Sequence, residues 1–149
     1  MRRRMIAASA LAASLAVAGC GGGESDAQKS AKKTADQVRQ AAAEGNVTQL
    51  CSGLFTPSLR ASFKALSGQP CETIVRTRVA PALATLKIKS ASVNKSNTLG
   101  VVVISDKSGS NDKLYLVKSG GAWKVNALFE PGIGRLKVPG KTGTTTTKK

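Results

Sequence analysis

The sequence contains no histidine and few aromatic residues, with Trp123 and Tyr115 the only ones of their kind beside three phenylalanines. Proton transfer at neutral pH usually needs a histidine or a buried carboxylate, and a serine nucleophile usually needs a histidine beside it. The acidic residues of the domain are expected on helix surfaces, in loops or at the ends of elements. Neither a histidine nor a CxxC spacing is present to bind a metal. The sequence therefore predicts a protein that is not an enzyme and has no cofactor or metal.

Acidic residues are also scarce relative to basic ones. The chain has 23 lysines and arginines against 8 aspartates and glutamates, which gives a formal charge of +15. Part of this excess lies outside the predicted fold, at residues 29–33 and 137–149. A basic surface of this kind is attracted to polyanions, and the compartment decides which polyanion the protein meets.

Residues 1–19 predict a signal peptide. A basic segment at residues 1–4 precedes an apolar run at residues 5–18. This run is shorter than the roughly 20 residues of a membrane-spanning helix and is typical of a signal-peptide core. It ends in Val-Ala-Gly-Cys at residues 17–20, which resembles the bacterial lipobox. The resemblance implies that Cys20 receives a diacylglyceryl group, with acyl chains such as palmitate, and that a peptidase cuts the chain before it.

Lipid attachment at Cys20 would place the protein at the extracytoplasmic face of the cell membrane. Two acyl chains, at about 0.8 kcal/mol per buried CH₂, anchor a protein stably, whereas one chain binds only marginally. Residues 20–34, with three glycines behind the cysteine, are expected to form a flexible tether. The alternative is an ordinary secretory signal with a coincidental cysteine. Both general secretion and twin-arginine export fit the basic segment.

The three cysteines are an odd number for an exported protein. Assigning Cys20 to lipid leaves Cys51 and Cys71, and such a pair is usually oxidised outside the cytoplasm. On the chain-entropy model, a disulfide between them would stabilise the fold by about 3 kcal/mol. The alternative is a pair of buried free thiols.

Residues 35–135 are expected to form one α+β domain. Helices first and strands afterwards predict N-terminal helices packed on one face of a curved, four-stranded antiparallel sheet. Thr56 and Pro57 indicate a helix start, as N-cap and first helical residue, and Leu66 is expected on the buried stripe of that helix. Pro81 is expected to kink or restart a later helix. Helical patterns cover residues 27–43, 47–54, 57–66 and 71–86.

The predicted strands alternate apolar and polar residues, as half-buried antiparallel strands do. Residues 119–121, Ser-Gly-Gly, predict a tight hairpin between the last two strands. Imperfect alternation predicts a bulge in the first strand. The lysine- and threonine-rich residues 136–149 are too polar to pack and are expected to be disordered. Strand patterns cover residues 87–94, 99–104, 113–118 and 122–129.

This arrangement resembles the nuclear transport factor 2-like superfamily of cone-shaped, cystatin-like α+β rolls. The resemblance covers about residues 35–129 and includes both cysteines of the predicted pair. Its main motifs are Ala-Ala-Glu-Gly-Asn at residues 42–46, Leu-Phe-Thr-Pro-Ser-Leu-Arg at residues 54–60 and the closing hairpin at residues 115–125. The chain is similar to exported actinobacterial members of this group, many of which have no known activity.

A cone-shaped sheet would allow an apolar pocket lined by aromatic residues. The residues that fit this hypothesis are Phe63, Tyr115, Trp123 and Phe129. The favoured interpretation of Trp123 is nevertheless a core residue that fills the helix–sheet interface. Enzymes of the superfamily that resemble ketosteroid isomerase place an acid on a strand facing the cone. The strands predicted at residues 87–94 and 99–104 contain no carboxylate, so the chain departs from that catalytic pattern.

The sequence thus predicts a non-catalytic binding or interaction module of the cell envelope. The alternative is a small-molecule carrier, or a vestigial isomerase-like enzyme, that uses the cone as a pocket. Expected partners are the membrane through Cys20, anionic lipid or wall polymer through the basic tail at residues 136–149, and an envelope protein or a second copy of the chain. Nucleic acid is not expected, because the protein is exported and lacks exposed aromatic platforms.

Overall fold

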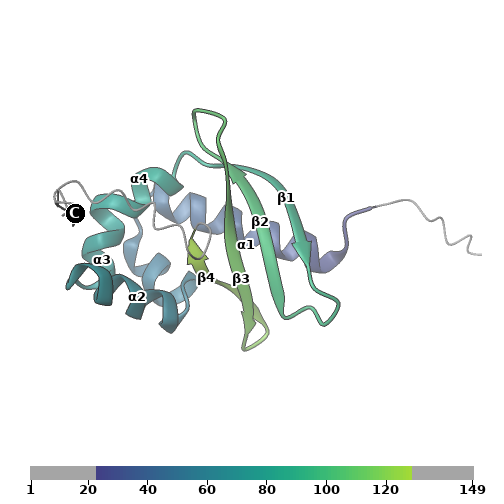
Figure 1. Ribbon diagram of the computed structural model, residues 1–149, viewed down its shortest axis with the longest axis horizontal. Helices are drawn as coiled ribbons and strands as arrows, with labels where there is room; N and C mark the ends of the chain where they lie inside the picture. The colour runs from purple at the N-terminus through teal and green to yellow at the C-terminus, as the bar shows by residue number, and fades with distance from the viewer. Residues whose placement is uncertain (1–22, 129–149) are drawn as a thin grey trace, which may run out of the picture.

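The computed structural model describes residues 23–128, in which helices come first and strands follow (Figure 1). This order confirms the α+β class. The helical elements are α1 (Asp26–Ala43), η1 (Gln49–Leu54), α2 (Pro57–Ser67), α3 (Cys71–Ile74), η2 (Val75–Val79) and α4 (Ala80–Leu83). The strands are β1 (Lys87–Val93), β2 (Leu99–Ser105), β3 (Asn111–Ser119) and β4 (Ala122–Leu128).

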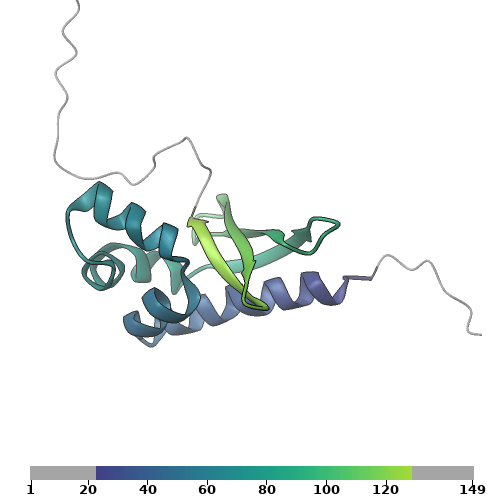
Figure 2. The same cartoon turned by 90° about the horizontal axis from the view of Figure 1, so that it is seen from below.

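The four strands form one antiparallel sheet in the order β1-β2-β3-β4. Helix α1 lies across one face of this sheet, as Figure 2 shows from below. The sheet is neither closed nor strongly curled, which corrects the expected curved cone. Small closed barrels need about eight strands, and here β1 and β4 both remain edge strands.

Helix α1 confirms the helical pattern predicted at residues 27–43 and begins one residue earlier, at Asp26. Ser25 caps it, because its hydroxyl accepts a hydrogen bond from the Gln28 N–H and the Gln28 side chain accepts one from the Ser25 N–H. Such a capping box satisfies two backbone donors that a helix start leaves unpaired. Residues 26–34 therefore belong to the helix, as the pattern at residues 27–43 predicts, and not to the flexible tether expected over residues 20–34. The tether assignment stays a prediction only for the part of the segment before Gly23.

The buried face of α1 consists of small residues. Short side chains allow the helix to lie close to the strands, and they compensate for the scarcity of aromatic residues in this core. The buried residues of the helix are Ala31, Thr34, Ala35, Val38, Ala41 and Ala42. At the N-terminal end of the helix, Gln28 Nε2 donates a hydrogen bond to the Ala91 carbonyl of β1 at 3.1 Å. Helix and sheet are thus joined by both packing and a polar contact.

Helix α2 starts as predicted, with Thr56 as N-cap and Pro57 in its first turn. It ends at Gly68, whose φ of 70° is left-handed and favours glycine. The buried stripe is shorter than predicted, because Leu66 is 75% exposed. The expectation for Leu66 is therefore wrong.

The helix that begins at Cys71 runs on past Pro81. Its middle, η2, is a π-helix that ends with the Ala80 N–H bonded to the Val75 carbonyl. Proline cannot donate a backbone hydrogen bond, and a π-turn is one way for a helix to accommodate a local irregularity. The helix is therefore irregular near Pro81, as expected, and the irregularity is the π-helical turn η2 that precedes the proline. Helix α4 then ends at Leu83, three residues before the predicted end.

The strands lie close to their predicted positions. Gly120 and Gly121 have φ values of 60° and 82°, the left-handed conformation that a type I′ hairpin turn requires at both central positions. The bulge predicted in β1 is present, because the register shifts between Ile88 and Ser90. A second shift, between Tyr115 and Leu116, lies opposite β4 and was not predicted.

Thr56 ties α2 to the sheet and offers a test of this arrangement. Its hydroxyl accepts the Leu59 N–H at 3.1 Å and donates to Asn126 Oδ1 of β4 at 2.9 Å. We expect Thr56→Ala to lower the free energy of unfolding by about 1–2 kcal/mol, because a cap and a half-buried hydrogen bond are lost together. Urea unfolding followed by circular dichroism measures this. Thr56→Ser keeps the hydroxyl and should retain most of the stability, and an equal loss in both variants would contradict the role of the hydroxyl.

Candidate functional site

The predicted site residues fall into two groups. Cys20 and Phe129 lie outside the described residues. Cys51, Phe63, Cys71, Tyr115 and Trp123 lie within them. Their positions decide whether the chain assembles the predicted disulfide and the predicted pocket.

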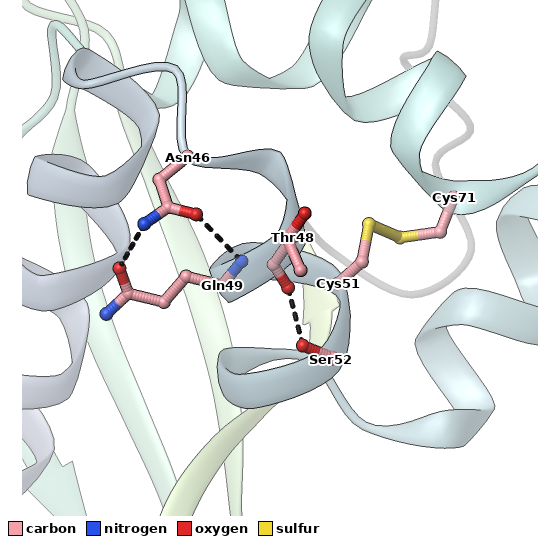
Figure 3. The surroundings of a disulfide bond; sticks show 6 residues. All are labelled: Asn46, Thr48, Gln49, Cys51, Ser52 and Cys71. Atoms are coloured by element: carbon pink, nitrogen blue, oxygen red, sulfur yellow. Dashed lines mark hydrogen bonds between the residues drawn. A yellow bond between two sulfur atoms is a disulfide. The ribbon is translucent and has the colours of Figure 1, made fainter.

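The disulfide between Cys51 and Cys71 is present, with the two Cα atoms 6.1 Å apart. Both cysteines are buried, and they join η1 to the first residue of α3 (Figure 3). The prediction of a disulfide is therefore confirmed. The bond links η1 to the start of the helix that runs from Cys71 to Leu83.

Local hydrogen bonds set the direction of Cys51. Asn46 Oδ1 accepts the Gln49 N–H at 3.1 Å, which starts the turn leading into η1 (Figure 3). The Ser52 hydroxyl bonds back to the Thr48 carbonyl on the exposed side. At the other end, the Phe55 N–H bonds to the Leu50 carbonyl, five residues back, and closes the π-helix.

Phe63 lies in the helical part of the core. It is 4% exposed, and its ring centroid is 6.0 Å from that of Phe55 at a tilted angle of 59°. Phe55 in turn pairs with Val125 of β4. Tilted aromatic pairs of this kind add to the stability that burial alone provides. The position of Phe63 is that of a packing residue.

Trp123 fills the space between the sheet and the helices. The side chain is 5% exposed, and a Cβ added at Gly100 of β2 would lie 3.4 Å from its Cζ3 atom. The ring therefore reaches across β3 and rests on the glycine. Lys118 Nζ lies 6.0 Å from the ring centroid, within the range of a cation–π contact.

Tyr115 and Trp123 do not share a site. Trp123 pairs with Lys118 on β3, three positions from Tyr115, and an odd separation along a strand places side chains on opposite faces. The burial of Leu114 and Leu116 on either side of Tyr115 agrees with this alternation. The structure therefore does not bring together Tyr115 and Trp123 as the pocket hypothesis required.

Tyr115 belongs instead to the face of the sheet that α1 does not cover, which we call the outer face. Cross-strand pairs on this face join Val101 to Tyr115 and Leu99 to Val117. Leu99 is 55% exposed, and the others are half-buried. The outer face includes Leu99, Val101, Val103, Lys113, Tyr115, Val117 and Lys124, with Ser90 and Ser92 of β1 and Ala127 of β4 beside them. It is an aliphatic surface with one tyrosine, and it carries lysines.

A signal for the outer face was available in the sequence. Residues 99–104 are apolar without alternation, and strands with this pattern usually have both faces covered. One face of β2 is covered by α1. Among residues 23–128, no helix is seen over the other face (Figure 2). An apolar strand with one uncovered face indicates a surface suited to binding.

The electrostatics of the sheet are mainly positive. Its acids are Asp106 and Asp112, and its lysines are Lys87, Lys89, Lys95, Lys107, Lys113, Lys118 and Lys124. Hydrogen bonds from the Ser108 hydroxyl and then from the backbone N–H of Ser110 lower the pKa of Asp106 below its usual value, although slight burial opposes them. This carboxylate therefore stays ionised and stabilises the turn between β2 and β3.

The described residues contain few groups suited to metal chemistry or membrane insertion. Within residues 23–128, no three histidine, cysteine, aspartate or glutamate residues are grouped to hold a metal ion. In the same range, no helix has the length and apolar character needed to cross a membrane. Comparisons with protein-family models, curated proteins and solved structures found no significant match.

The contribution of the disulfide can be measured directly. Replacing Cys51 and Cys71 together by alanine should lower the free energy of unfolding by about 3 kcal/mol, because the unfolded chain gains the freedom of a 20-residue separation. Urea unfolding measures the difference. A reducing agent should destabilise the wild-type protein by a similar amount and leave the double variant unchanged. Insensitivity of the wild-type protein to reduction would contradict the prediction.

The two aromatic residues of the sheet should differ in their effect on stability. We expect Trp123→Ala to cost about 3–5 kcal/mol, because it leaves a large cavity in the core. Tyr115→Ala, on the outer face, should cost less than half as much. Urea unfolding monitored by circular dichroism compares them, since it does not depend on tryptophan emission. Equal losses in the free energy of unfolding would show that Trp123 contributes no more to the core than Tyr115 does.

Proposed function

We propose that this protein is a lipoprotein anchored through Cys20 at the extracytoplasmic face of the cell membrane, where its domain acts as a non-catalytic binding or interaction module. The observation that carries the proposal is the pairing of Cys51 with Cys71. This pair accounts for two of the three cysteines and leaves Cys20 alone at the end of a lipobox-like segment. Disulfides are typical of compartments outside the cytoplasm, which agrees with export.

The outer face supports a binding role. Half-buried side chains such as Val101, Tyr115 and Val117 offer apolar area, and tyrosine is frequent at protein interfaces because it combines an apolar ring with a polar tip. Lys124 adds a positive charge beside them. This combination fits an envelope protein with an apolar, acidic surface.

A relationship to the nuclear transport factor 2-like superfamily remains part of the proposal. It is supported by the order of helices before strands, the sheet order β1-β2-β3-β4 and the glycine turn between β3 and β4. A role as a small-molecule carrier receives less support. Tyr115 and Trp123 lie on opposite faces of an open sheet, so they cannot line a common pocket.

Substitution of Cys20 tests the anchor. We expect wild-type protein in the membrane fraction with an intact mass that includes diacylglyceryl, and Cys20→Ala in the soluble fraction or unprocessed. The acyl chains supply the membrane affinity, so their loss should release the domain.

A control separates lipid attachment from general export. Gly19→Ala keeps a small residue before the cysteine and should be acylated like the wild-type protein. Unmodified Cys20 in the wild-type protein, or a fully processed Cys20→Ala variant that stays in the membrane, would overturn the anchor.

A further inference from the structure

Three segments that are far apart in the sequence meet at one end of the domain. Gln28, in the first turn of α1, bonds to Ala91 near the end of β1. The turn between β1 and β2 is joined to the end of β3 by the Lys118 N–H, which donates to the Thr98 carbonyl at 2.9 Å. Figures 1 and 2 both place the N-terminus of α1 and the β1–β2 turn away from α2, α3 and α4. We call this the anchor end.

The anchor end is positively charged and carries an exposed leucine. Its acids are already paired, Asp26 with Lys29 and Glu24 with Lys32. Lys33, Lys95 and Lys118 are exposed, and within residues 23–128 none of them forms an ion pair. Leu99, which follows the β1–β2 turn, is 55% exposed.

The length of chain before α1 places this end near the lipid. Cys20 precedes the N-cap Ser25 by five residues, and five extended residues span about 17 Å. Helix α1, with 18 residues, is about 27 Å long. The anchor end is therefore within reach of the membrane surface, whereas the α2–α4 end lies a helix length further along the domain.

We infer that the anchor end docks on the bilayer and binds anionic lipid headgroups, with Leu99 in the interfacial region. This inference rests on the lipid anchor proposed above. The anchor alone would allow the domain to rotate freely. Lysines near an anionic surface each change the binding equilibrium about fivefold, so three of them acting together would select one orientation.

Trp123 is a built-in probe of this orientation. It is the only tryptophan of the chain, and its ring lies 6.0 Å from Lys118 Nζ at the anchor end. Acyl chains brominated close to the headgroup quench tryptophan emission at short range. In acylated full-length protein, quenching should be stronger in vesicles of phosphatidylcholine and phosphatidylglycerol than in phosphatidylcholine alone. Added salt should reduce the difference, because it screens exposed charges.

Charge reversal at the two ends of the domain provides the decisive comparison. Lys33→Glu with Lys95→Glu should reduce quenching in the anionic vesicles at least twofold. Arg76→Glu with Arg78→Glu reverses two exposed charges in η2, at the opposite end of the domain. This variant should show nearly the same quenching as the wild-type protein. Likewise Leu99→Ser should reduce quenching, whereas Leu66→Ser, at the other leucine exposed within residues 23–128, should not.

The outcomes distinguish the docking from the anchor. Acylated, vesicle-bound protein whose quenching is the same in both vesicle types, or falls equally with both charge reversals, would overturn the docking and leave the anchor intact. Protein that carries no acyl group would overturn the anchor itself.

Discussion

The packing of α1 on one face of the sheet is the contact on which the rest of the structure depends. Small residues such as Ala31, Ala35 and Val38 are almost fully buried there, and they bring the helix close enough for Gln28 to bond to β1. This packing defines an inner face that Trp123 completes and an outer face that the helix leaves uncovered. It also brings the start of the helix beside the turns of the sheet. Both proposed surfaces follow from it.

The remaining helices are shorter than α1, and covalent and polar contacts add to their apolar packing. Element η1 has six residues, and α3, η2 and α4 together form one helix from Cys71 to Leu83; helices of these lengths are marginal alone. The bond between Cys51 and Cys71 holds two of them together, and Thr56 joins α2 to β4. An aromatic-poor domain of this size buries a modest core, so such contacts carry an unusually large share of its stability.

Local structure could be predicted from the sequence wherever one or two residues determine a helix start, a turn or a disulfide. A threonine before a proline marked the start of α2, two adjacent glycines marked a hairpin, and two leftover cysteines marked a disulfide. Longer-range geometry was less accessible. The capping box at Ser25 was hidden in a polar segment, and Leu66 has helical spacing but no element of the described chain to pack against. Tyr115 and Trp123 lie on opposite faces of the sheet because of the register between β3 and β4. No single residue between them specifies that register.

The two proposed surfaces are compatible because of the direction of the strands. The β1–β2 turn lies at the anchor end, whereas the β3–β4 turn lies at the same edge of the sheet but nearer the middle of α1 (Figure 1). With the β1–β2 turn on the bilayer, the middle of the outer face would lie further from the lipid than Leu99 does. Its residues Val101 and Tyr115 are mid-strand, away from the turn that holds Lys95. The proposed membrane contact would use Leu99 but leave Val101 and Tyr115 uncovered, so the two proposals do not exclude each other.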